Sequence, residues 1–331
     1  MIIGIYFDKM KIERGGAITY VHDLLSALSR LEHHPRHRFV LFGWDSSPPD
    51  GFNGGNIRYV PLKLSFPEIV TSETYRILSK GARAIRILGR DARPSHLRKE
   101  IIDRKILQSG IQVLWCLTQN VPTWEIPYVF PLMDLAHRIH PYFPEVSRDG
   151  IWDDREDFFG KTLGRASFVL AGTARGKEEI VRFYQVPEEK VRVVPLPTPS
   201  FAAVAPDMEA DHVLKKHGLP TDFLFYPARF WPHKNHVAIL RAVREIKDRG
   251  GREYPVVFAG YDSGNRSHIE KAVRDLGLNA QVHILGHVSY EDLACLYRKA
   301  AALVFASFFG PDNLPPLEAF GLGCPVLAAD V

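Results

Sequence analysis

The residues best suited to binding an anion lie in the second half of the chain, directly after a predicted strand. That strand, Phe223–Pro227, runs into a loop that carries Arg229 and Lys234. Ligands of parallel α/β sheets bind at the carboxyl ends of the strands, where this loop would lie. A guanidinium fork, an ammonium group and the N-terminus of the next helix together suit a diphosphate. The alternative is that both residues are solvated loop cations, and this segment alone favours that alternative.

A second candidate binding segment follows the predicted strand Ala302–Ala306. The pair Pro315-Pro316 can open the first turn of a helix. The loop amides before that turn, at the positive end of the helix, suit an oxygen-rich ligand. Glu318 would lie in the first turn, where its carboxylate can accept hydrogen bonds from the vicinal hydroxyls of a ribose. The alternative is that Glu318 only complements the helix dipole.

In the first half, the pair Gly15-Gly16 separates a predicted strand, Ile2–Phe7, from a predicted helix, Ile18–Leu31. Glycine at such a turn lets the backbone approach a ligand. The pair is not part of a Gly-x-Gly-x-x-Gly sequence, so the dinucleotide-binding fingerprint is absent. A plain turn explains the two glycines about equally well.

Further polar residues follow the predicted strand Tyr128–Leu132, where Asp134 is succeeded by His137 and His140. A carboxylate and an imidazole at a strand end are candidates for proton transfer. A single histidine is more often a hydrogen-bonded structural residue than a catalyst. Because Asp134 is close in sequence, we weigh a catalytic and a structural role of His137 equally.

The elements that must position these residues alternate between short β-rich runs and longer helical patterns, which predicts parallel sheets covered on both faces. The predicted strands are Ile2–Phe7, Phe39–Gly43, Ile57–Val60, Val113–Cys116, Tyr128–Leu132, Phe168–Ala171, Val191–Pro195, Phe223–Pro227, Val256–Ala259, Val282–Leu285, Ala302–Ala306 and Pro325–Ala328. The predicted helices include Ile18–Leu31, Lys177–Tyr184, His236–Asp248, His268–Leu276 and Tyr290–Lys299. The fold class is therefore α/β with two Rossmann-like domains.

A chain of 331 residues is long enough for two domains. The proline-rich sequence Leu196–Ser200 suits a linker, because proline discourages both helix and strand. We predict an N-terminal domain over 1–196, a linker over 197–210 and a C-terminal domain over 211–331. The C-terminal domain is thin for a doubly wound fold and has no closing helix, so we expect it to be an incomplete part of a longer protein.

Composition excludes several functional classes. An apolar fraction of 46% and a charged fraction of 24% are those of a soluble globular protein, and a net charge of +4 does not indicate a nucleic-acid partner. The three cysteines lie far apart, which favours a reducing compartment without structural zinc. The N-terminus resembles a strand rather than a leader peptide, and no apolar run is long enough to span a membrane. We expect a cytoplasmic protein.

A basic amphipathic stretch over residues 76–105 suits peripheral contact with an anionic membrane, at its inner face. Such contact would fit a lipid-linked acceptor, although an ordinary solvated helix face is the somewhat favoured alternative. No Asp-x-Asp triplet occurs in the chain. We therefore predict no metal and no cofactor, and expect cations and a helix dipole to neutralise any diphosphate.

The order of these motifs resembles the retaining group 1 glycosyltransferases, a GT-B family with two Rossmann-like domains facing a cleft. The matching motifs are Tyr-x-x-Arg-x4-Lys-Asn from Tyr226, a glycine turn, Leu-Gly-x-Val from Leu285, and Leu-Pro-Pro-Leu-Glu-Ala-Phe-x-x-Gly-x-Pro-Val from Leu314. The resemblance extends from residue 15 to residue 326 and is most specific at 226–235 and 307–326. The family includes many mannosyl- and glucosyltransferases of cell-surface polysaccharides.

The resemblance implies a role for each candidate residue. Arg229 and Lys234 would bind the donor diphosphate, and Glu318 the ribose. The backbone of Asn313, Leu314 and Pro315 would lie near the transferred sugar. In the first domain, Gly16 would approach the donor phosphate and the acceptor, and Asp134 and His137 would be the catalytic pair.

The chain departs from the family pattern at two positions. Gly310 stands where the family has a Glu, eight residues before Glu318, that holds a donor-sugar hydroxyl. Asp312 is the nearest substitute in sequence. Met133 stands where the family has a His before Asp134. His137 and His140 are the candidates to replace that histidine in space.

The resemblance implies transfer of a hexose, with mannose favoured by family prevalence, from a nucleoside diphosphate sugar to a hydroxyl of a glycan or lipid-linked acceptor. Retention would follow from front-face attack assisted by the departing phosphate. Two alternatives stay open: a non-catalytic protein that binds nucleotide sugars, and a GT-B epimerase of nucleotide sugars. A dehydrogenase is the weakest alternative, because the glycine fingerprint is missing.

Overall fold

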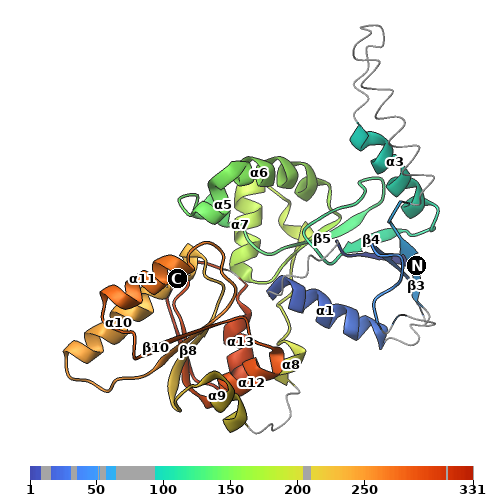
Figure 1. Cartoon of the computed structure of the whole chain (residues 1–331). Coiled ribbons are helices and arrows are strands. Elements are labelled where there is room, and N and C mark those ends of the chain that lie inside the picture. Colours follow the sequence, from blue (N-terminus) through green and yellow to red (C-terminus); the bar gives the residue numbers. More distant parts are fainter. Residues whose placement is uncertain are drawn as a thin grey trace. The chain divides into compact units, whose positions relative to one another are not determined.

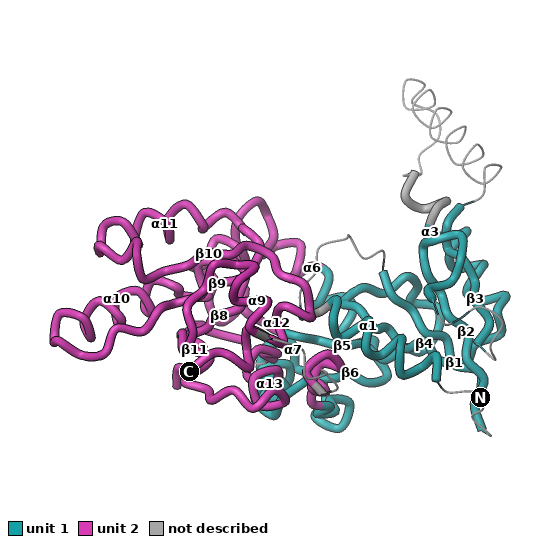
Figure 2. Tube along the Cα trace, turned by 60° about the horizontal axis from the view of Figure 1, so that its bottom comes forward, with its two compact units in different colours: residues 1–133, 158–194 teal, residues 134–157, 195–331 magenta. Residues whose placement is uncertain are grey.

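The computed structural model describes residues 1–8, 16–30, 36–50, 52, 57–64, 94–203, 210–310 and 312–330 (Figure 1). The chain forms two compact units, coloured separately in Figure 2. Unit 1 comprises Met1–Met133 and Phe158–Val194, and unit 2 comprises Asp134–Asp157 and Pro195–Val331. The segment Asp134–Asp157 therefore contributes to unit 2, although unit 1 flanks it on both sides in sequence.

Unit 1 is built on a sheet of seven parallel strands in the order β3-β2-β1-β4-β5-β6-β7. The strands are β1 (Ile2–Tyr6), β2 (Arg38–Gly43), β3 (Ile57–Pro61), β4 (Val113–Cys116), β5 (Tyr128–Leu132), β6 (Phe168–Ala171) and β7 (Val191–Val193). The strand order reverses between β1 and β4. This reversal is the point at which open α/β sheets bind ligands.

The helices of unit 1 connect these strands. They are α1 (Gly16–Ser29), α3 (Pro94–Leu107), η2 (Leu163–Arg165), α7 (Ala174–Tyr184) and η3 (Glu188–Lys190), together with the end of α6 (Ile151–Thr162), whose larger part belongs to unit 2. Helix α1 buries Val21 and Leu25 against Ile5 of β1 and Leu41 of β2. Helix α7 begins where Thr173 Oγ1 accepts a hydrogen bond from the Gly176 amide, as an N-cap threonine does.

Unit 2 contains a sheet of five parallel strands in the order β10-β9-β8-β11-β12. The strands are β8 (Phe223–Pro227), β9 (Val256–Ala259), β10 (Val282–Gly286), β11 (Ala300–Phe305) and β12 (Val326–Ala328). Here the order reverses between β8 and β11. The loops that follow β8 and β11 therefore lie side by side, at the position where ligands bind in open α/β sheets.

Helices cover both faces of the second sheet. Figure 1 shows α10 and α11 on one side, and α8, α9, α12 and α13 on the other. The helical elements that lie wholly in unit 2 are α4 (Ala136–Ile139), α5 (Pro144–Ser147), η1 (Arg148–Gly150), α8 (Ser200–Ala203), α9 (Ala210–His217), η4 (Pro232–Lys234), α10 (His236–Asp248), α11 (Arg266–Asp275), α12 (Tyr290–Lys299) and α13 (Leu314–Gly321). The core between the layers includes Phe223, Phe225, Phe258 and Leu303, each fully buried.

The α/β prediction with two parallel sheets is confirmed, and every predicted strand is present. Strands β4, β5, β6, β8 and β9 have the predicted bounds. Strand β7 ends two residues before the predicted Pro195, because the chain leaves the sheet at the proline-rich sequence. Helix α3 lies partly within the stretch for which a solvated helix face was the favoured alternative, whereas α6, α9 and the short helical turns were not among the helices named from the sequence.

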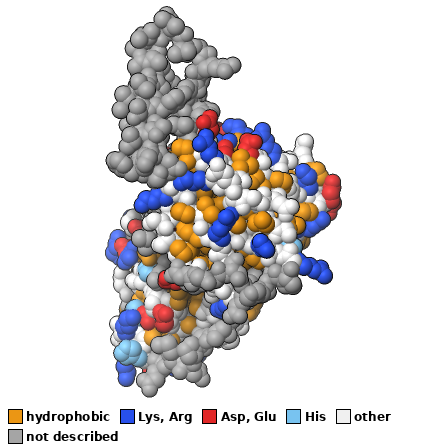
Figure 3. Space-filling model, turned by 90° about the vertical axis from the view of Figure 1, so that its right-hand side faces the viewer, with side chains coloured by type: hydrophobic (Ala, Val, Ile, Leu, Met, Phe, Trp, Pro, Cys, Tyr) orange, Lys and Arg blue, Asp and Glu red, His pale blue; other side chains and the backbone are white. Residues whose placement is uncertain are grey.

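Some sequence-based predictions lie outside the described residues, namely Gly15 and the part of the basic stretch before Pro94. In the described part of that stretch, Lys105 Nζ donates to the Lys63 carbonyl at 2.9 Å, and Lys99 lies 3.8 Å from Asp103. Figure 3 shows Lys and Arg side chains dispersed among hydrophobic ones on one face. Among the described helices, none combines the length and the apolar character needed to cross a bilayer.

Candidate functional site

Lys234 connects the two loops at the switch point of the second sheet. It ends η4, which follows β8, and its Nζ lies 3.4 Å from both Ser307 Oγ and Asn313 Oδ1, in the loop after β11. The backbone is fixed as well, because the Tyr226 hydroxyl donates to the Lys234 carbonyl at 2.9 Å. The amide of Phe308 donates to the His233 carbonyl at 2.8 Å. The side chain that we predicted to bind a phosphate is therefore held between both loops.

The environment of Lys234 changes its protonation equilibrium. Burial lowers the pKa of its ammonium group to about 8, although the carboxylates of Asp134 and Glu145 act in the opposite direction. The ammonium group also lies 5.6 Å from the centre of the Phe305 ring. Lys234 is thus mainly charged at neutral pH. A ligand that brings negative charge offsets the free-energy cost of burying this ammonium group.

Arg229 follows β8 and contacts the loop after the neighbouring strand β9. Its guanidinium group lies 5.8 Å from the ring centre of Tyr261, which stacks on His287 at 4.5 Å. The loop after β9 passes close to the end of β8 at Gly260. The φ of Gly260 is +156°, and a Cβ there would lie 2.2 Å from the Ala228 carbonyl oxygen. This close approach requires glycine at position 260. It places half-buried Arg229 over an aromatic pair.

Helix α13 presents its N-terminus at the same switch point. Asn313 is its N-cap residue, and Pro315 and Pro316 follow Leu314 in the first turn, as predicted. The two prolines lack amide hydrogens, so the donors of this turn are concentrated at Asn313 and Leu314. The positive end of the helix dipole adds to the charge of Lys234. This arrangement suits the oxygen atoms of a phosphate.

Gly310 adopts a conformation that other residues rarely take. Its φ is +136°, and a Cβ there would lie 2.6 Å from the side-chain amide of Asn313. The same amide donates to the Gly310 carbonyl at 2.5 Å. A Glu at position 310, as in the family pattern, would therefore displace Asn313 from Lys234. Asp312, the substitute suggested by sequence, is half-buried in the same loop.

Glu318 is buried rather than open to solvent. Its carboxyl Oε2 accepts a hydrogen bond from the Tyr297 hydroxyl at 2.7 Å, and only 8% of the residue is exposed. Burial raises the pKa of this carboxyl group to about 7. Tyr297, fully buried in α12, therefore orients a carboxyl group that is partly protonated at neutral pH.

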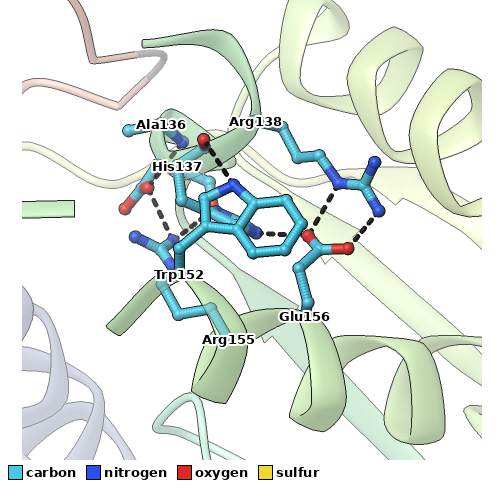
Figure 4. A network of polar contacts seen from close by, with 7 residues as sticks. Ala136, His137, Arg138, Trp152, Arg155 and Glu156 are labelled. Carbon is cyan, nitrogen blue, oxygen red and sulfur yellow. Dashed lines mark hydrogen bonds and ion pairs between the residues drawn. The ribbon is translucent and has the colours of Figure 1, made fainter. Parts of the chain in front are cut away.

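His137 lies in the interior of unit 2 and is fully buried. Figure 4 shows its ring nitrogen Nε2 directed at Glu156 Oε1, at a distance of 2.8 Å. Arg138 Nε donates to the same oxygen at 2.7 Å, and the Trp152 indole donates to the His137 carbonyl at 3.1 Å. Burial lowers the pKa of the His137 imidazole. This position suits a neutral histidine that orders the segment around it.

Asp134 lies at the edge of the same network. Its Oδ1 accepts hydrogen bonds from the Ala136 amide at 3.0 Å and from the Arg155 guanidinium group at 2.7 Å. Its carboxylate also acts electrostatically on Lys234 and His233. The structure therefore brings Asp134 near the cationic site.

His140, rather than His137, reaches the loop after β11. Its ring stacks on Phe309 at 5.0 Å with an interplanar angle of 13°, and its Nδ1 lies 2.8 Å from the Tyr142 hydroxyl. Phe309 also stacks on His233 at 4.2 Å. Phe309 directly precedes Gly310, so the segment after Asp134 contributes an imidazole beside the loop that carries Asn313.

The sequence did not indicate two groups of polar residues that the structure brings together. In unit 2, Glu145 of α5 contacts His233. In unit 1, Asn120 Nδ2 donates to Asp8 Oδ2 at 2.8 Å, and the Trp44 indole donates to the Tyr6 hydroxyl at 3.2 Å, at the carboxyl ends of β1, β2 and β4. The apolar run before Asp8 predicted a strand, but nothing in the sequence linked Asp8 to Asn120. Gly16 is the first residue of α1 in this unit.

Within the described residues, no group of three or more His, Cys, Asp or Glu side chains is arranged to hold a metal ion. Cys116, Cys295 and Cys324 are buried thiols that form no disulfide. The site is therefore defined by Lys234, Arg229 and the α13 N-terminus. This combination, at the switch point of a parallel sheet in an α/β protein, suits a phosphate-bearing ligand.

Comparison with known proteins identifies the class more closely. Residues 209–331 match the model of the family described as glycosyl transferases group 1. The chain is similar to O-antigen chain mannosyltransferase B from Escherichia coli, 27% identical over 52% of this chain and 45% of that protein. It is also similar to O-antigen chain mannosyltransferase RfbU from Salmonella typhimurium, 25% identical over 69% of this chain and 59% of that protein. The chain thus spans about half the length of these curated relatives.

Solved structures agree on the fold. The lipopolysaccharide glycosyltransferase WaaG superposes with a TM-score of 0.65 and 12% identity, covering 100% of this chain and 81% of that one. Anabaena HepE, solved in complex with UDP and glucose, gives a TM-score of 0.65 and 14% identity over 99% of this chain and 81% of that one. Residues 209–331 thus belong to the group 1 glycosyltransferases, and the chain has the GT-B fold.

Proposed function

We propose that the protein transfers a hexose from a nucleoside diphosphate sugar to a hydroxyl of a glycan or lipid-linked acceptor. The observation that carries this proposal is the contact of Lys234 with Ser307 and Asn313 beside the N-terminus of α13. A buried cation and a helix dipole at one point match the negative charge of a leaving diphosphate. Arg229, in the same loop after β8, supplies a second cation.

Loss of the diphosphate is the step at which these groups act. When the bond between the anomeric carbon and the phosphate oxygen breaks, its electron pair stays with the diphosphate. Lys234 and the amides of Asn313 and Leu314 stabilise that charge more strongly than they stabilise the intact donor, which lowers the barrier. The buried carboxyl of Glu318, oriented by Tyr297, binds the ribose hydroxyls of the donor.

Retention of configuration follows from front-face attack, in which the departing phosphate takes the proton of the acceptor hydroxyl. A covalent intermediate on a carboxylate pair has less support, because Gly310 replaces one carboxylate of the family pattern. Asp134 is a carboxylate that acts electrostatically on Lys234. We propose that Asp134 orients the donor sugar toward the acceptor. His137 orders the segment that carries Asp134, and His140 places its imidazole beside Phe309.

The acceptor binds to unit 1 in this proposal. The hydrogen-bonded group of Asp8 and Asn120 lies at the switch point of that sheet and offers partners for sugar hydroxyls. Gly16, at the first residue of α1, lets the chain approach the donor phosphate. A lipid-linked acceptor would bring the enzyme to the inner face of the membrane from the cytoplasm, through the basic stretch over 76–105.

The transferred sugar is proposed to be mannose. The support is the description of the curated relatives as mannosyltransferases. HepE was solved with UDP and glucose, so the nucleotide has to be decided by experiment. Calorimetric titration with GDP, UDP and ADP, followed by donor turnover with a mannan acceptor, tests the proposal. Binding of none of the three nucleotides would refute it.

The two alternative functions give different products in the same assay. A nucleotide-sugar epimerase would release an epimerised donor without acceptor. A non-catalytic binding protein would bind the nucleotide and never consume the donor. Transfer to an added acceptor, with retention, separates the glycosyltransferase from both.

A further inference from the structure

A buried carboxylate from outside the two binding loops supports the turn that carries Lys234. Glu145 belongs to α5, and only 4% of its side chain is exposed. Its Oε1 accepts a hydrogen bond from the backbone amide of His233 at 3.0 Å and lies 2.5 Å from Nδ1 of the same residue. Both contacts join segment 134–157 to η4.

The two contacts act on the same turn. The amide at position 233 lies in the first turn of η4, where backbone donors lack helical partners, and Glu145 supplies an acceptor. Burial lowers the pKa of the His233 imidazole, which favours the neutral ring. With Nδ1 carrying the hydrogen, the ring donates to Glu145. One carboxylate oxygen therefore fixes both the backbone and the side chain of the residue before Lys234.

The charge of Glu145 matters in addition to its geometry. The titratable groups that face Lys234 are Asp134, Glu145 of α5, His233 of η4 and His236 of α10. Both histidines are kept neutral by burial. The two carboxylates are therefore the anions that balance the buried ammonium group, and both belong to segment 134–157.

We propose that Glu145 is a positioning residue of the diphosphate site, which fixes the turn bearing Lys234 and balances its charge before the donor binds. The nature of the bound ligand rests on the proposed function, but the action of Glu145 on Lys234 does not. Within the described residues, Glu145 Oε2 is buried without a hydrogen-bond partner. An amide nitrogen can therefore take its place without breaking a bond, so Glu145→Gln removes the charge and retains an acceptor for His233.

The test separates charge from position. NMR titration of lysine labelled at Cε, with the Lys234 signal identified by its loss in Lys234→Gln, measures the Lys234 pKa without any nucleotide. We expect Glu145→Gln to lower that pKa by roughly one unit, as removal of a nearby opposite charge does. The matched control is Glu245→Gln, which removes the same charge from an exposed pair with Arg249. An unchanged Lys234 pKa in Glu145→Gln would overturn the charge role.

Nucleotide binding gives the second readout. In calorimetry with the nucleotide that the parent binds, Glu145→Gln should match the parent at pH 6 and bind several-fold more weakly at pH 8.5. Glu145→Ala should bind more weakly at both pH values, because the turn loses its acceptor as well. Parental affinity of Glu145→Ala at both pH values would overturn the positioning role. Should the parent bind no nucleotide, the proposed function fails, while the NMR titration still decides the action of Glu145 on Lys234.

Discussion

The Nζ atom of Lys234 lies 3.4 Å from Oδ1 of Asn313, although 79 positions separate the two residues in sequence. The contact joins the loop after β8 to the N-cap of α13. Because Asn313 also donates to the Gly310 carbonyl, its amide cannot rotate without giving up one of its two partners. A phosphate that binds here meets a cation whose direction is already set.

The first prediction concerns nucleotide affinity. Lys234→Ala or Arg229→Ala should weaken binding of the nucleoside diphosphate more than tenfold, which corresponds to about 1.4 kcal/mol. The reason is the loss of a cation from the diphosphate site. Isothermal titration calorimetry measures the effect. Lys271→Ala is the control, because Lys271 forms an exposed pair with Asp275 on α11. Parental affinity of both site variants would show that the phosphate binds elsewhere.

The second prediction concerns the stability cost of the buried cation. The pKa of Lys234 falls from 10.5 to about 8 on folding, so the unfolded chain binds more protons between these values and stability rises with pH there. Lys234→Met should therefore stabilise the protein at pH 7. The expected gain is roughly 1–3 kcal/mol, from which the contribution of the lost hydrogen bonds is subtracted. Urea unfolding at pH 7 and pH 10 measures the difference. A variant less stable than the parent at pH 7 would contradict the predicted cost.

The third prediction concerns Glu318. Its pKa rises from 4.5 to about 7 on folding, so its contribution to stability is complete below pH 4.5 and is lost as the pH rises through 7. Glu318→Gln should therefore gain stability relative to the parent between pH 5 and pH 8. The same variant should bind the nucleotide more weakly, because it loses the carboxylate proposed to bind the ribose.

Tyr297→Phe provides the complementary variant. The Tyr297 hydroxyl lowers the Glu318 pKa by donating to it, so its removal should move the pH midpoint of the stability change upward. Thermal unfolding between pH 4 and pH 9 measures both variants. A parental pH profile in Glu318→Gln would mean that Glu318 does not titrate in this range.

The fourth prediction concerns Gly310. Gly310→Ala should destabilise the protein by about 1–3 kcal/mol, because a side chain is strained at this φ and its Cβ would contact Asn313. Nucleotide affinity should fall as well, since Asn313 would leave Lys234. Gly160→Ala is the control, because Gly160 lies in α6 and its Cβ would meet no atom within 4 Å. Equal melting temperatures of the two variants would contradict the close packing at Gly310.

Much of the fold was predictable because it depends on local pattern. Runs such as Val256–Ala259, buried at every position, predict a strand of a parallel sheet without further information. The meeting of Lys234 and Asn313 was also predictable, because the carboxyl ends of parallel strands share one edge. Helix α6 was missed because its aromatic and acidic residues give no clear apolar stripe in sequence.

The site partners that were missed depend on long-range contacts. Glu145 and His233 are 88 positions apart, and neither belongs to a motif that points to the other. His137 was weighed equally as catalyst and structural residue, because its partner Glu156 lies 19 positions further on. Sequence placed it beside Asp134 and gave no sign that its ring is buried while that of His140 reaches Phe309.

The ring of Phe309 stacks on two imidazoles, those of His140 and His233. These three rings come from three separate stretches of chain, so none of those stretches is free to shift alone. If a bound donor displaces the loop after β11, one of two changes must follow. Either Phe309 loses its stacking contacts, or η4 and the segment after Asp134 move together with the loop. The loop after β11, η4 and the segment after Asp134 are therefore packed together through one phenylalanine ring.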